Sequence, residues 1–277
     1  MRFFIFGILF FFLLPVFACH KQKWIHTSNG ISYQLFSLDT SKAKPIYGDR
    51  IWMHLRKYSD ENKEIFNTNI FETTSGVELE FKQSTNANDV IQFFSLLGKG
   101  DSIKLKVPAH LLDSSIHRRN KKYTFIMTLV DFKTKSAYET EKINQAQAQQ
   151  ALDSTAMENY LQRNLLKNFV VDSSGIWYAI NNTENGDSIK KGMLIKIHYK
   201  GYLLNNLVFD NSHERKTPLQ FTVGAKQVID GLDIGIQHFR IGDKGTLIIP
   251  SRLAYGDRSV GAIPSNSVLV FEVEILK

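Results

Sequence analysis

The chain has 277 residues, of which 43% are hydrophobic and 22% charged, and its formal net charge is +7. This length suits one large domain or two ordinary ones, each able to bury its own core. The single cysteine excludes a disulfide within the chain. The densest basic cluster, residues 118–122, belongs to no recognisable nucleic-acid module and is interpreted as a solvated loop, so no nucleic-acid partner is expected.

The N-terminus combines one arginine with an apolar run too short to span a bilayer comfortably, MRFFIFGILFFFLLPVF. This layout predicts an export signal over residues 1–18, the alternatives being a membrane anchor or a buried first strand. The tetrapeptide VFAC at 16–19 resembles the cleavage box of bacterial lipoproteins. That resemblance implies lipidation of Cys19 and a periplasm-facing protein anchored to a membrane of the bacterial envelope. Ordinary cleavage that leaves a free thiol is the alternative.

The remaining chain contains an internal repeat, with four pairs of related segments in the same order. The pairs are SNGISYQL (28–35) with SSGIWYAI (173–180), GDRIWMH (48–54) with GMLIKIH (192–198), GKGDSIKLKVP (98–108) with FRIGDKGTLIIP (239–250), and YTFIMTL (123–129) with LVFEVEI (269–275). One similar segment arises easily by chance, whereas four in sequence order do not. The chain is therefore expected to hold two related domains.

The two halves are joined by a segment of different composition. Residues 136–169 are rich in Ala, Gln, Glu, Lys and Leu, lack Pro and Gly, and favour helix by propensity. An irregular apolar stripe runs through Ala148, Leu152, Met157, Tyr160, Leu161, Leu165 and Leu166. A lone helix of this length is marginal in water, so residues 133–170 are expected to form a linker helix that packs on a neighbour or pairs with a second chain in a homodimer. A solvated spacer is the alternative.

Alternating apolar and polar residues in the second half predict half-buried strands. The predicted strands are Ile176–Ile180, Leu194–Tyr202, Leu219–Val223, Gly245–Ile249 and Val268–Ile275. One short helix is expected near residues 228–239, where Leu232, Ile236 and Phe239 fall on one helical face. Antiparallel strands with one amphipathic helix indicate an α+β domain whose sheet curls over the helix.

Six segments of the second half then follow one another in an order that is specific to one family. They are IHYKGYL (197–203), VFDNS (208–212), PLQFTVG (218–224), VIDGLDIGI (228–236), IGDKGTLIIPSRLAYG (241–256) and IPSNSVLVFEVEIL (263–276). The set resembles FKBP-type peptidyl-prolyl cis-trans isomerases, and the similarity extends over residues 171–277. Together with the repeat, it implies two FKBP-like domains, each a curved antiparallel sheet wrapped over a short helix, with residues 24–132 forming a second, degenerate copy.

The resemblance implies a proline-binding site. The catalytic residues carried over by position are Tyr199, Phe209, Asp210, Phe221, Val228, Ile229, Leu232, Tyr255, Ile263 and Phe271, with Arg215 and Leu219 assigned to substrate binding. Leu232 and Leu219 stand where many family members have aromatic residues. Without the resemblance, the apolar members are better explained as ordinary core. Asp210 would require a partner if buried, and the family precedent suggests Tyr199 or Arg215.

The chemistry implied by the resemblance requires neither a cofactor nor a metal. The barrier of about 18–20 kcal/mol to rotation of an X-Pro bond comes from partial double-bond character. No covalent bond is made or broken, and an apolar site favours the twisted, less polar amide over the planar one. The expected partners are therefore proline-containing polypeptide clients.

Each residue has an expected role. The pyrrolidine ring would lie against Phe209, Phe221, Leu232 and Phe271. The Ile229 N–H and the Tyr255 hydroxyl would donate hydrogen bonds to substrate carbonyls. Asp210 would orient Tyr199 or Arg215, or would face the carbonyl carbon of the substrate, and the sequence does not choose between these roles.

The first half keeps the landmarks of the repeat but lacks the site. Leu55 matches Tyr199, and Phe66-Asn67 matches Phe209-Asp210 with one residue of drift, while Asn86-Ala87 and Leu111-Leu112-Asp113 stand opposite Val228-Ile229 and Leu253-Ala254-Tyr255. The expected function is a prolyl isomerase that acts as a folding factor for exported proteins, with the first half capturing clients. The alternative is a non-catalytic FKBP-like lipoprotein that acts as a binding adaptor in an envelope complex.

Overall fold

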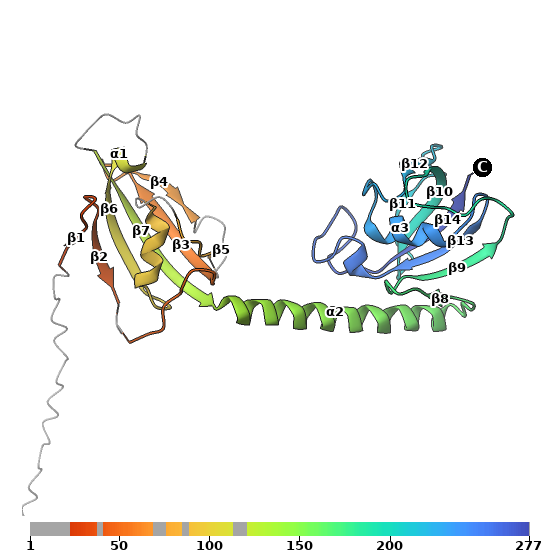
Figure 1. Ribbon diagram of the computed structural model, residues 1–277, viewed down its shortest axis with the longest axis horizontal. Helices are drawn as coiled ribbons and strands as arrows, with labels where there is room; N and C mark the ends of the chain where they lie inside the picture. Colours follow the sequence, from red (N-terminus) through yellow and green to blue (C-terminus); the bar gives the residue numbers. More distant parts are fainter. Residues whose placement is uncertain (1–22, 38–40, 69–75, 85–88, 113–120, 277) are drawn as a thin grey trace, which may run out of the picture. The chain divides into compact units, whose positions relative to one another are not determined.

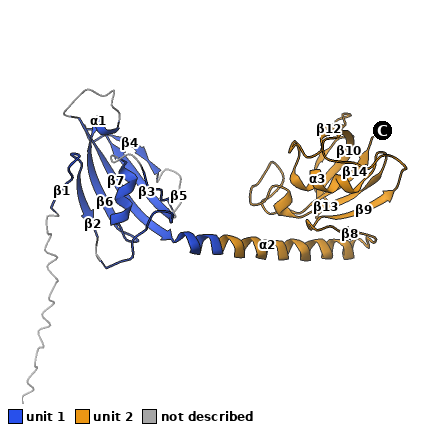
Figure 2. Cartoon of the chain, viewed as in Figure 1, with its two compact units in different colours: residues 1–140 blue, residues 141–277 orange. Residues whose placement is uncertain are grey.

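The computed structural model describes residues 23–37, 41–68, 76–84, 89–112 and 121–276 (Figure 1). The chain divides into two compact units, residues 1–140 and 141–277 (Figure 2). The predicted export signal and Cys19 lie outside the described residues. Within the described ranges, no helix is both long enough and apolar enough to cross a membrane.

The first unit is an antiparallel sheet with short helices. Its strands are β1 (Ile25–His26), β2 (Ser32–Phe36), β3 (Arg50–Tyr58), β4 (Glu64–Asn67), β5 (Val77–Glu80), β6 (Ser102–Pro108) and β7 (Lys122–Lys133). A 3₁₀ helix, η2 (Val90–Leu96), and a short α1 (Ala109–Leu112) complete it. The strand order is β1-β2-β6-β7-β3-β4, with β5 paired to β3.

The second unit repeats this arrangement. Its strands are β8 (Val170–Val171), β9 (Trp177–Asn182), β10 (Leu194–Leu203), β11 (Val208–Asn211), β12 (Leu219–Thr222), β13 (Lys244–Ile249) and β14 (Leu269–Ile275). Its helices are α3 (Asp230–Gly235), η3 (Ile236–His238) and η4 (Ser251–Leu253). The order β11-β10-β14-β13-β9-β8, with β12 paired to β10, has a counterpart in the first unit for every described strand.

The two sheets share their register as well as their order. Leu55 pairs with Met127 in the first unit, and Tyr199 pairs with Val273 in the second. The repeat of the sequence aligns the same residues, so it reflects a repeated structure. The α+β class, with two antiparallel sheets and a long helix between them in the chain, is confirmed.

The core of the second unit lies between the sheet and α3. Leu232, Ile236 and Phe239, the predicted apolar face, are each at most 2% exposed and belong to one buried cluster with residues of β10, β13 and β14. Burying such side chains contributes roughly 1.5–3 kcal/mol each. The strands appear where the alternation predicts them, while the helix is shorter than expected because its last turn tightens into η3.

Both units share a detail in the turn that leads into β6 and β13. Asp101 Oδ2 accepts a hydrogen bond of 2.9 Å from the Gly98 N–H, and Asp243 Oδ2 accepts one of 2.8 Å from the Arg240 N–H. Both aspartates are at most 3% exposed. Each therefore satisfies a backbone donor three residues earlier, which explains why the Gly-Asp pair marks the same place in both halves.

The linker helix α2 (Lys135–Arg163) docks at its C-terminal half on the second sheet. Met157, Tyr160 and Leu161 are at most 9% exposed, in a cluster with residues of β10, β13 and β14. The solvated-spacer alternative is therefore wrong for this part of the helix. The predicted stripe is only partly correct, because Leu152 and Leu165 are 64% and 82% exposed.

Candidate functional site

A cavity of about 400 Å³ opens between α3 and one end of the second sheet. Its lining comes from β10, β11, β12, β14, residues 227–232 at the start of α3 and the segment 255–263. The lining residues are Tyr199, Phe209, Asp210, Leu219, Gln227, Val228, Ile229, Leu232, Tyr255, Val260, Gly261, Ala262, Ile263 and Phe271. Most of these side chains are apolar, so the cavity suits a small apolar ring better than a charged ligand.

Aromatic rings form one wall of this cavity. Phe271 is 5% exposed, and its ring centroid lies 5.7 Å from those of both Tyr199 and Phe209. The Phe209 ring meets it edge to face at 74°, a favoured aromatic arrangement. Leu232, which is 2% exposed, adds a buried aliphatic surface from α3.

Phe209 reaches this wall because β11 carries an irregularity. The pairing of β10 with β11 shifts between Gly201 and Tyr202, which leaves Phe209 as the extra residue of a bulge. A β-bulge redirects the side chain it carries. A Cβ atom at Gly201 would lie 2.6 Å from ring carbons of Phe209. The missing side chain of Gly201 is therefore a requirement for the aromatic wall.

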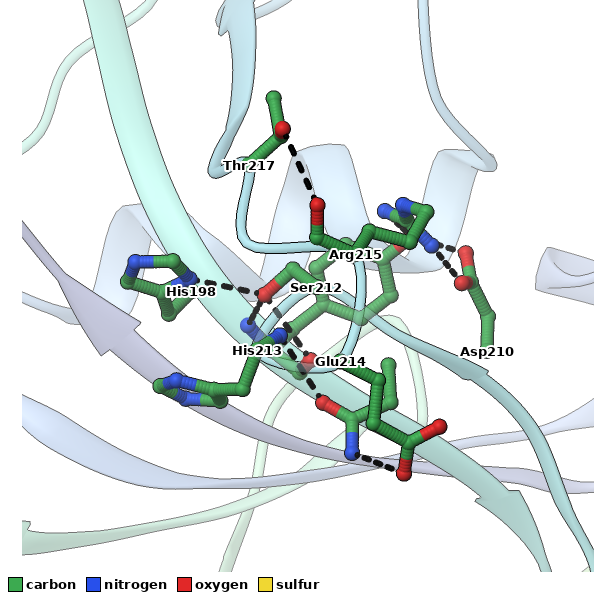
Figure 3. Close-up of polar contacts among 9 residues, drawn as sticks. His198, Asp210, Ser212, His213, Glu214, Arg215 and Thr217 are labelled. Carbon is green, nitrogen blue, oxygen red and sulfur yellow. Dashed lines mark hydrogen bonds and ion pairs between the residues drawn. The ribbon is translucent and has the colours of Figure 1, made fainter.

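A polar trio lies at the edge of the cavity. The Tyr199 hydroxyl donates a hydrogen bond to Asp210 Oδ2. Arg215 forms an ion pair with Asp210 Oδ1 (Figure 3). Arg215 Nη2 also donates to the Tyr199 hydroxyl over 3.2 Å. The Asp210 side chain is 36% exposed, so it is not a buried carboxylate, and it has both of the partners that the sequence left as alternatives.

The loop that supplies Arg215 is anchored to β10 by Ser212, which is fully buried. The Tyr199 N–H donates to Ser212 Oγ over 2.8 Å, and the Ser212 N–H donates to the Tyr199 carbonyl over 2.9 Å. His198 Nδ1 lies 3.0 Å from the same Ser212 oxygen, and its ring stacks on His213 at 4.3 Å (Figure 3). His198 is thus a packing residue of this anchor and does not line the cavity.

Two donors at the cavity are available to a ligand. Within the described part of the chain, no hydrogen bond uses the Ile229 N–H or the Tyr255 hydroxyl as its donor. The Ile229 carbonyl, in contrast, accepts from the N–H groups of Leu232 and Asp233 at 3.1 Å as α3 begins. An apolar cavity with two unused donors can hold a ring and orient one or two carbonyl groups.

The structure brings ten of the twelve predicted site residues to the cavity lining. The other two do not line it. Arg215 pairs with Asp210, and Phe221 lies in the core, where it is 2% exposed and paired with Ile195. Sequence reasoning missed four lining residues, namely Gln227, Val260, Gly261 and Ala262. They lie next to motif segments in the chain, but their own residue types carry no signal for such a site. Among the described residues, no group of three or more His, Cys, Asp or Glu side chains could hold a metal ion.

The equivalent place in the first unit is built differently. Lys57 pairs with Phe125 as Gly201 pairs with Phe271, so Lys57 stands in the position of the required glycine. The Lys57 ammonium lies 5.6 Å from the centroid of the Phe125 ring and 4.6 Å from that of Tyr123. A cation over these rings interacts favourably with their faces.

The one-residue drift in the aligned motif is also real. Phe66 pairs with Lys57 as Asp210 pairs with Gly201, so the counterpart of Asp210 is Phe66. The bulged residue corresponding to Phe209 is Ile65, which is 53% exposed. The matching positions Asn86, Ala87 and Asp113 lie outside the described residues.

The comparisons with known proteins concentrate on the second unit. The family described as FKBP-type peptidyl-prolyl cis-trans isomerase matches residues 186–276. The FKBP-type peptidyl-prolyl cis-trans isomerase FkpA of Buchnera aphidicola is 39% identical over 132 residues, covering 45% of this chain and 54% of that protein. FK506-binding protein 1 of Saccharomyces cerevisiae is 49% identical over 89 residues, covering 32% and 78%. The crystal structure of FkpA from Escherichia coli is 33% identical with a TM-score of 0.41, covering 51% and 68%.

The matched segment spans about half the length of the curated FkpA proteins, at 54% and 52% of the two from Buchnera aphidicola. The 89-residue segment matched to FK506-binding protein 1, in contrast, spans 78% of that protein.

Proposed function

Since the chain belongs to the FKBP-type peptidyl-prolyl cis-trans isomerase family, we propose that its second unit isomerises X-Pro bonds in polypeptide clients. The observation that carries the proposal is the cavity itself. It combines an aromatic wall with two unused hydrogen-bond donors, at Ile229 and Tyr255. That arrangement can hold a pyrrolidine ring and fix the carbonyls on either side of it.

The reaction is a rotation about the amide bond. The prolyl ring lies against Phe209, Leu232 and Phe271, while the preceding carbonyl turns out of the amide plane. Twisting the amide removes its resonance and reduces its dipole, so an apolar wall disfavours the planar ground state more than the twisted state. The rate increase then comes from differential binding of the transition state, without any nucleophile.

The donors hold the rest of the peptide while the bond turns. The Ile229 N–H, at the start of α3, donates to one substrate carbonyl, and the Tyr255 hydroxyl donates to another. Asp210 accepts from Tyr199 and pairs with Arg215, so it keeps the Tyr199 ring against Phe271. This orienting role is the one that its observed contacts support.

A turnover assay tests the proposal. The full chain is added to a short Leu-Pro or Phe-Pro peptide, whose uncatalysed isomerisation takes about 10–100 s at 25 °C. Acceleration at micromolar protein is the expected result. If a folded chain does not accelerate the reaction, the isomerase proposal is contradicted. The binding-adaptor function would then remain, in which the same cavity binds a polypeptide without turnover.

The proposed cellular role is a folding factor for exported proteins, lipidated at Cys19 and facing the periplasm. The support is the apolar run that ends at Ala18-Cys19, together with the slowness of prolyl isomerisation in folding chains. Mass spectrometry of the mature N-terminus tests it. A diacylated Cys19 is expected, and Cys19→Ser should give an uncleaved or soluble product. An unmodified mature N-terminus would contradict the lipid anchor.

For the first unit, we propose client binding without catalysis, within the boundaries 24–132 expected from the sequence. The support is its shared framework, the replacement of Gly201 by Lys57, and the exposed apolar strand β4, where Ile65 and Phe66 are 53% and 47% exposed. Such apolar surface commonly serves protein partners. Binding there would raise the local concentration of a client near the isomerase site.

A further inference from the structure

A buried carboxylate on the linker helix is hydrogen-bonded to the segment that leads to Tyr255. Asp153 of α2 is 3% exposed, and its partner Ser251 lies 98 residues further along the chain. Asp153 Oδ2 accepts hydrogen bonds from the Ser251 N–H at 2.8 Å and from Ser251 Oγ at 2.7 Å. Asp153 Oδ1 accepts a third, at 2.8 Å, from Gln149 Nε2. A carboxylate in such a place is costly unless it is bonded in this way.

Ser251 opens the turn that carries Tyr255. Its carbonyl accepts hydrogen bonds from the Ala254 N–H at 3.0 Å and from the Gly256 N–H at 2.9 Å. The Gly256 carbonyl then accepts from the Asn266 N–H at 2.7 Å. Hydrogen bonds to Ser251 therefore hold the residues on both sides of Tyr255, and Ser251 itself is held by Asp153.

The first unit has no such link at the matching position. Pro108 corresponds to Pro250, so Ala109 corresponds to Ser251 and has no hydroxyl to donate. The Ala109 N–H donates instead to the Lys121 carbonyl at 2.9 Å, within its own unit. The contact with the linker helix thus accompanies the unit that has the aromatic cavity.

We propose that Asp153 is a positioning residue that holds the Ser251–Gly256 turn, and through it the Tyr255 hydroxyl, in the geometry needed for turnover. The proposal rests on the proposed isomerase function. It makes the docked half of α2 part of the working site, because the carboxylate that fixes the turn comes from the helix. A fragment that begins at residue 171 would lack it.

The experiment measures kcat/KM for a Leu-Pro peptide with the full chain, using Asp153→Ala, Tyr255→Phe and the double variant. Asp153→Ala is expected to lower kcat/KM about tenfold, as small misplacements of a positioned group do. If Asp153 acts through Tyr255, the double variant should lose little more than Asp153→Ala alone, since the two changes are coupled. Ser251→Ala, which copies Ala109 and removes one hydrogen bond, should show the same coupling with a smaller loss.

Met157→Ala is the matched control. Met157 is 1% exposed on the same helix, and its cluster includes neither Ser251 nor Tyr255. This variant should lower Tm as Asp153→Ala does, yet its effect on kcat/KM should add to that of Tyr255→Phe. Additive losses for Asp153→Ala and Tyr255→Phe would overturn the proposal, because they would show that Asp153 supports only the fold.

Amide hydrogen exchange gives a readout that does not depend on turnover. In Asp153→Ala, the N–H groups of Ala254 and Gly256 should exchange about tenfold faster while those of β13 and β14 keep their protection. Unchanged exchange in the turn would overturn the positioning role whether or not the chain is active. If the wild-type chain is inactive but its turn still loosens in Asp153→Ala, the proposed function is contradicted, while the role of Asp153 in holding the turn is supported.

Discussion

The two units place corresponding strands in the same order, but the first unit does not keep the residues that form the cavity wall of the second. At the strand pair that forms its wall, the second unit has Gly201 beside Phe271, and the first has Lys57 beside Phe125. The bulged residue is Phe209 in one unit and Ile65 in the other. The framework therefore does not depend on the residues that make the cavity, and a fold can be kept while its site changes.

In both units, a hydroxyl side chain ties a loop to the neighbouring long strand, β3 in the first unit and β10 in the second. Thr68 in the first unit donates to the Leu55 carbonyl at 3.4 Å and accepts from its N–H at 2.8 Å, as Ser212 does for Tyr199. Both hydroxyls are buried. A side chain that satisfies backbone groups is thus shared, whereas the phenol at Tyr199 that faces the cavity is replaced by an aliphatic chain.

The strongest test of this difference is Gly201→Lys, which places the residue of the first unit in the second. The new Cβ would lie 2.6 Å from Phe209 ring carbons and 3.2 Å from a Phe271 ring carbon. Turnover of a Leu-Pro peptide should fall by at least about 100-fold. Overpacking should also cost about 1–3 kcal/mol of stability. Gln220→Glu, which copies Glu78 at an exposed position of β12, is the control and should change neither. Near-normal turnover in Gly201→Lys would mean that the aromatic wall is not required.

Asp210→Ala removes the carboxylate that the first unit lacks, since Phe66 stands there. Tyr199 and Arg215 lose their shared acceptor, and kcat/KM should fall about tenfold, in line with the loss of charge-assisted hydrogen bonds. The Tm should change little, because the Arg215 side chain is 45% exposed and still donates to the Tyr199 hydroxyl. Glu214→Ala in the same loop is the matched control. An equal loss in both variants would point to the loop fold rather than to the carboxylate.

Tyr255→Phe removes one hydroxyl from the cavity and leaves its ring. The expected loss in kcat/KM is about fivefold, the cost of one hydrogen bond to a substrate carbonyl. Thermal unfolding should match the wild type, since the hydroxyl has no partner among the described residues. Tyr178→Phe, which alters a ring stacked on His238 away from the cavity, should leave turnover unchanged. Full activity in Tyr255→Phe would remove the hydroxyl from the mechanism.

The turn before β9 gives a comparison of stability, because Asp172 in the second unit corresponds to Thr27 in the first. Burial alone would raise the pKa of Asp172, but hydrogen bonds from Ser174 and from the Ile176 N–H, together with His238 Nε2 at 2.8 Å, outweigh it and lower the pKa below its ordinary value of 3.8. A lowered folded-state pKa means that the ionised carboxylate stabilises the folded state.

Asp172→Thr should therefore reduce the free energy of unfolding by about 1–3 kcal/mol at pH 7. The contribution of Asp172 is fully present above the ordinary pKa of 3.8 and is lost as the pH falls through the lower folded-state value. Urea unfolding of wild type and variant between pH 3 and 8 measures it. A stability difference that stays constant to the lowest pH would show that ionisation of Asp172 is not its cause.

Much of the fold could be predicted from the sequence because the landmarks carry physical constraints. Gly242-Asp243 and Gly100-Asp101 mark turns in which the aspartate bonds to a backbone donor, so the repeat is readable at those points. Alternation of apolar residues located the long strands. In the second unit, the strands β8 and β11 were missed, because the two residues of β8 have no periodicity and the residues of β11, Val208–Asn211, do not alternate.

The candidate site could be predicted only through the resemblance. Phe209 and Phe271 become neighbours through strand pairing and a bulge, and neither is visible in the alternation of residues. The partner of Asp153 could not be predicted, because Ser251 lies 98 residues away and neither residue is distinctive alone. Likewise, the importance of Gly201 and Lys57 could not be predicted, because it depends on the rings with which they pair across the strands, Phe271 and Phe125.

The claim that the second unit alone carries the isomerase site is tested most directly by deleting residues 24–132 and measuring kcat/KM for a Leu-Pro peptide. The deletion leaves the docked half of α2 and every residue of the cavity in place. We expect a kcat/KM within about twofold of that of the full chain, because sites without shared contacts act independently. Refolding of a proline-limited protein substrate should slow at the same time. Loss of peptide turnover in the folded deletion variant would show instead that the first unit is part of the active site.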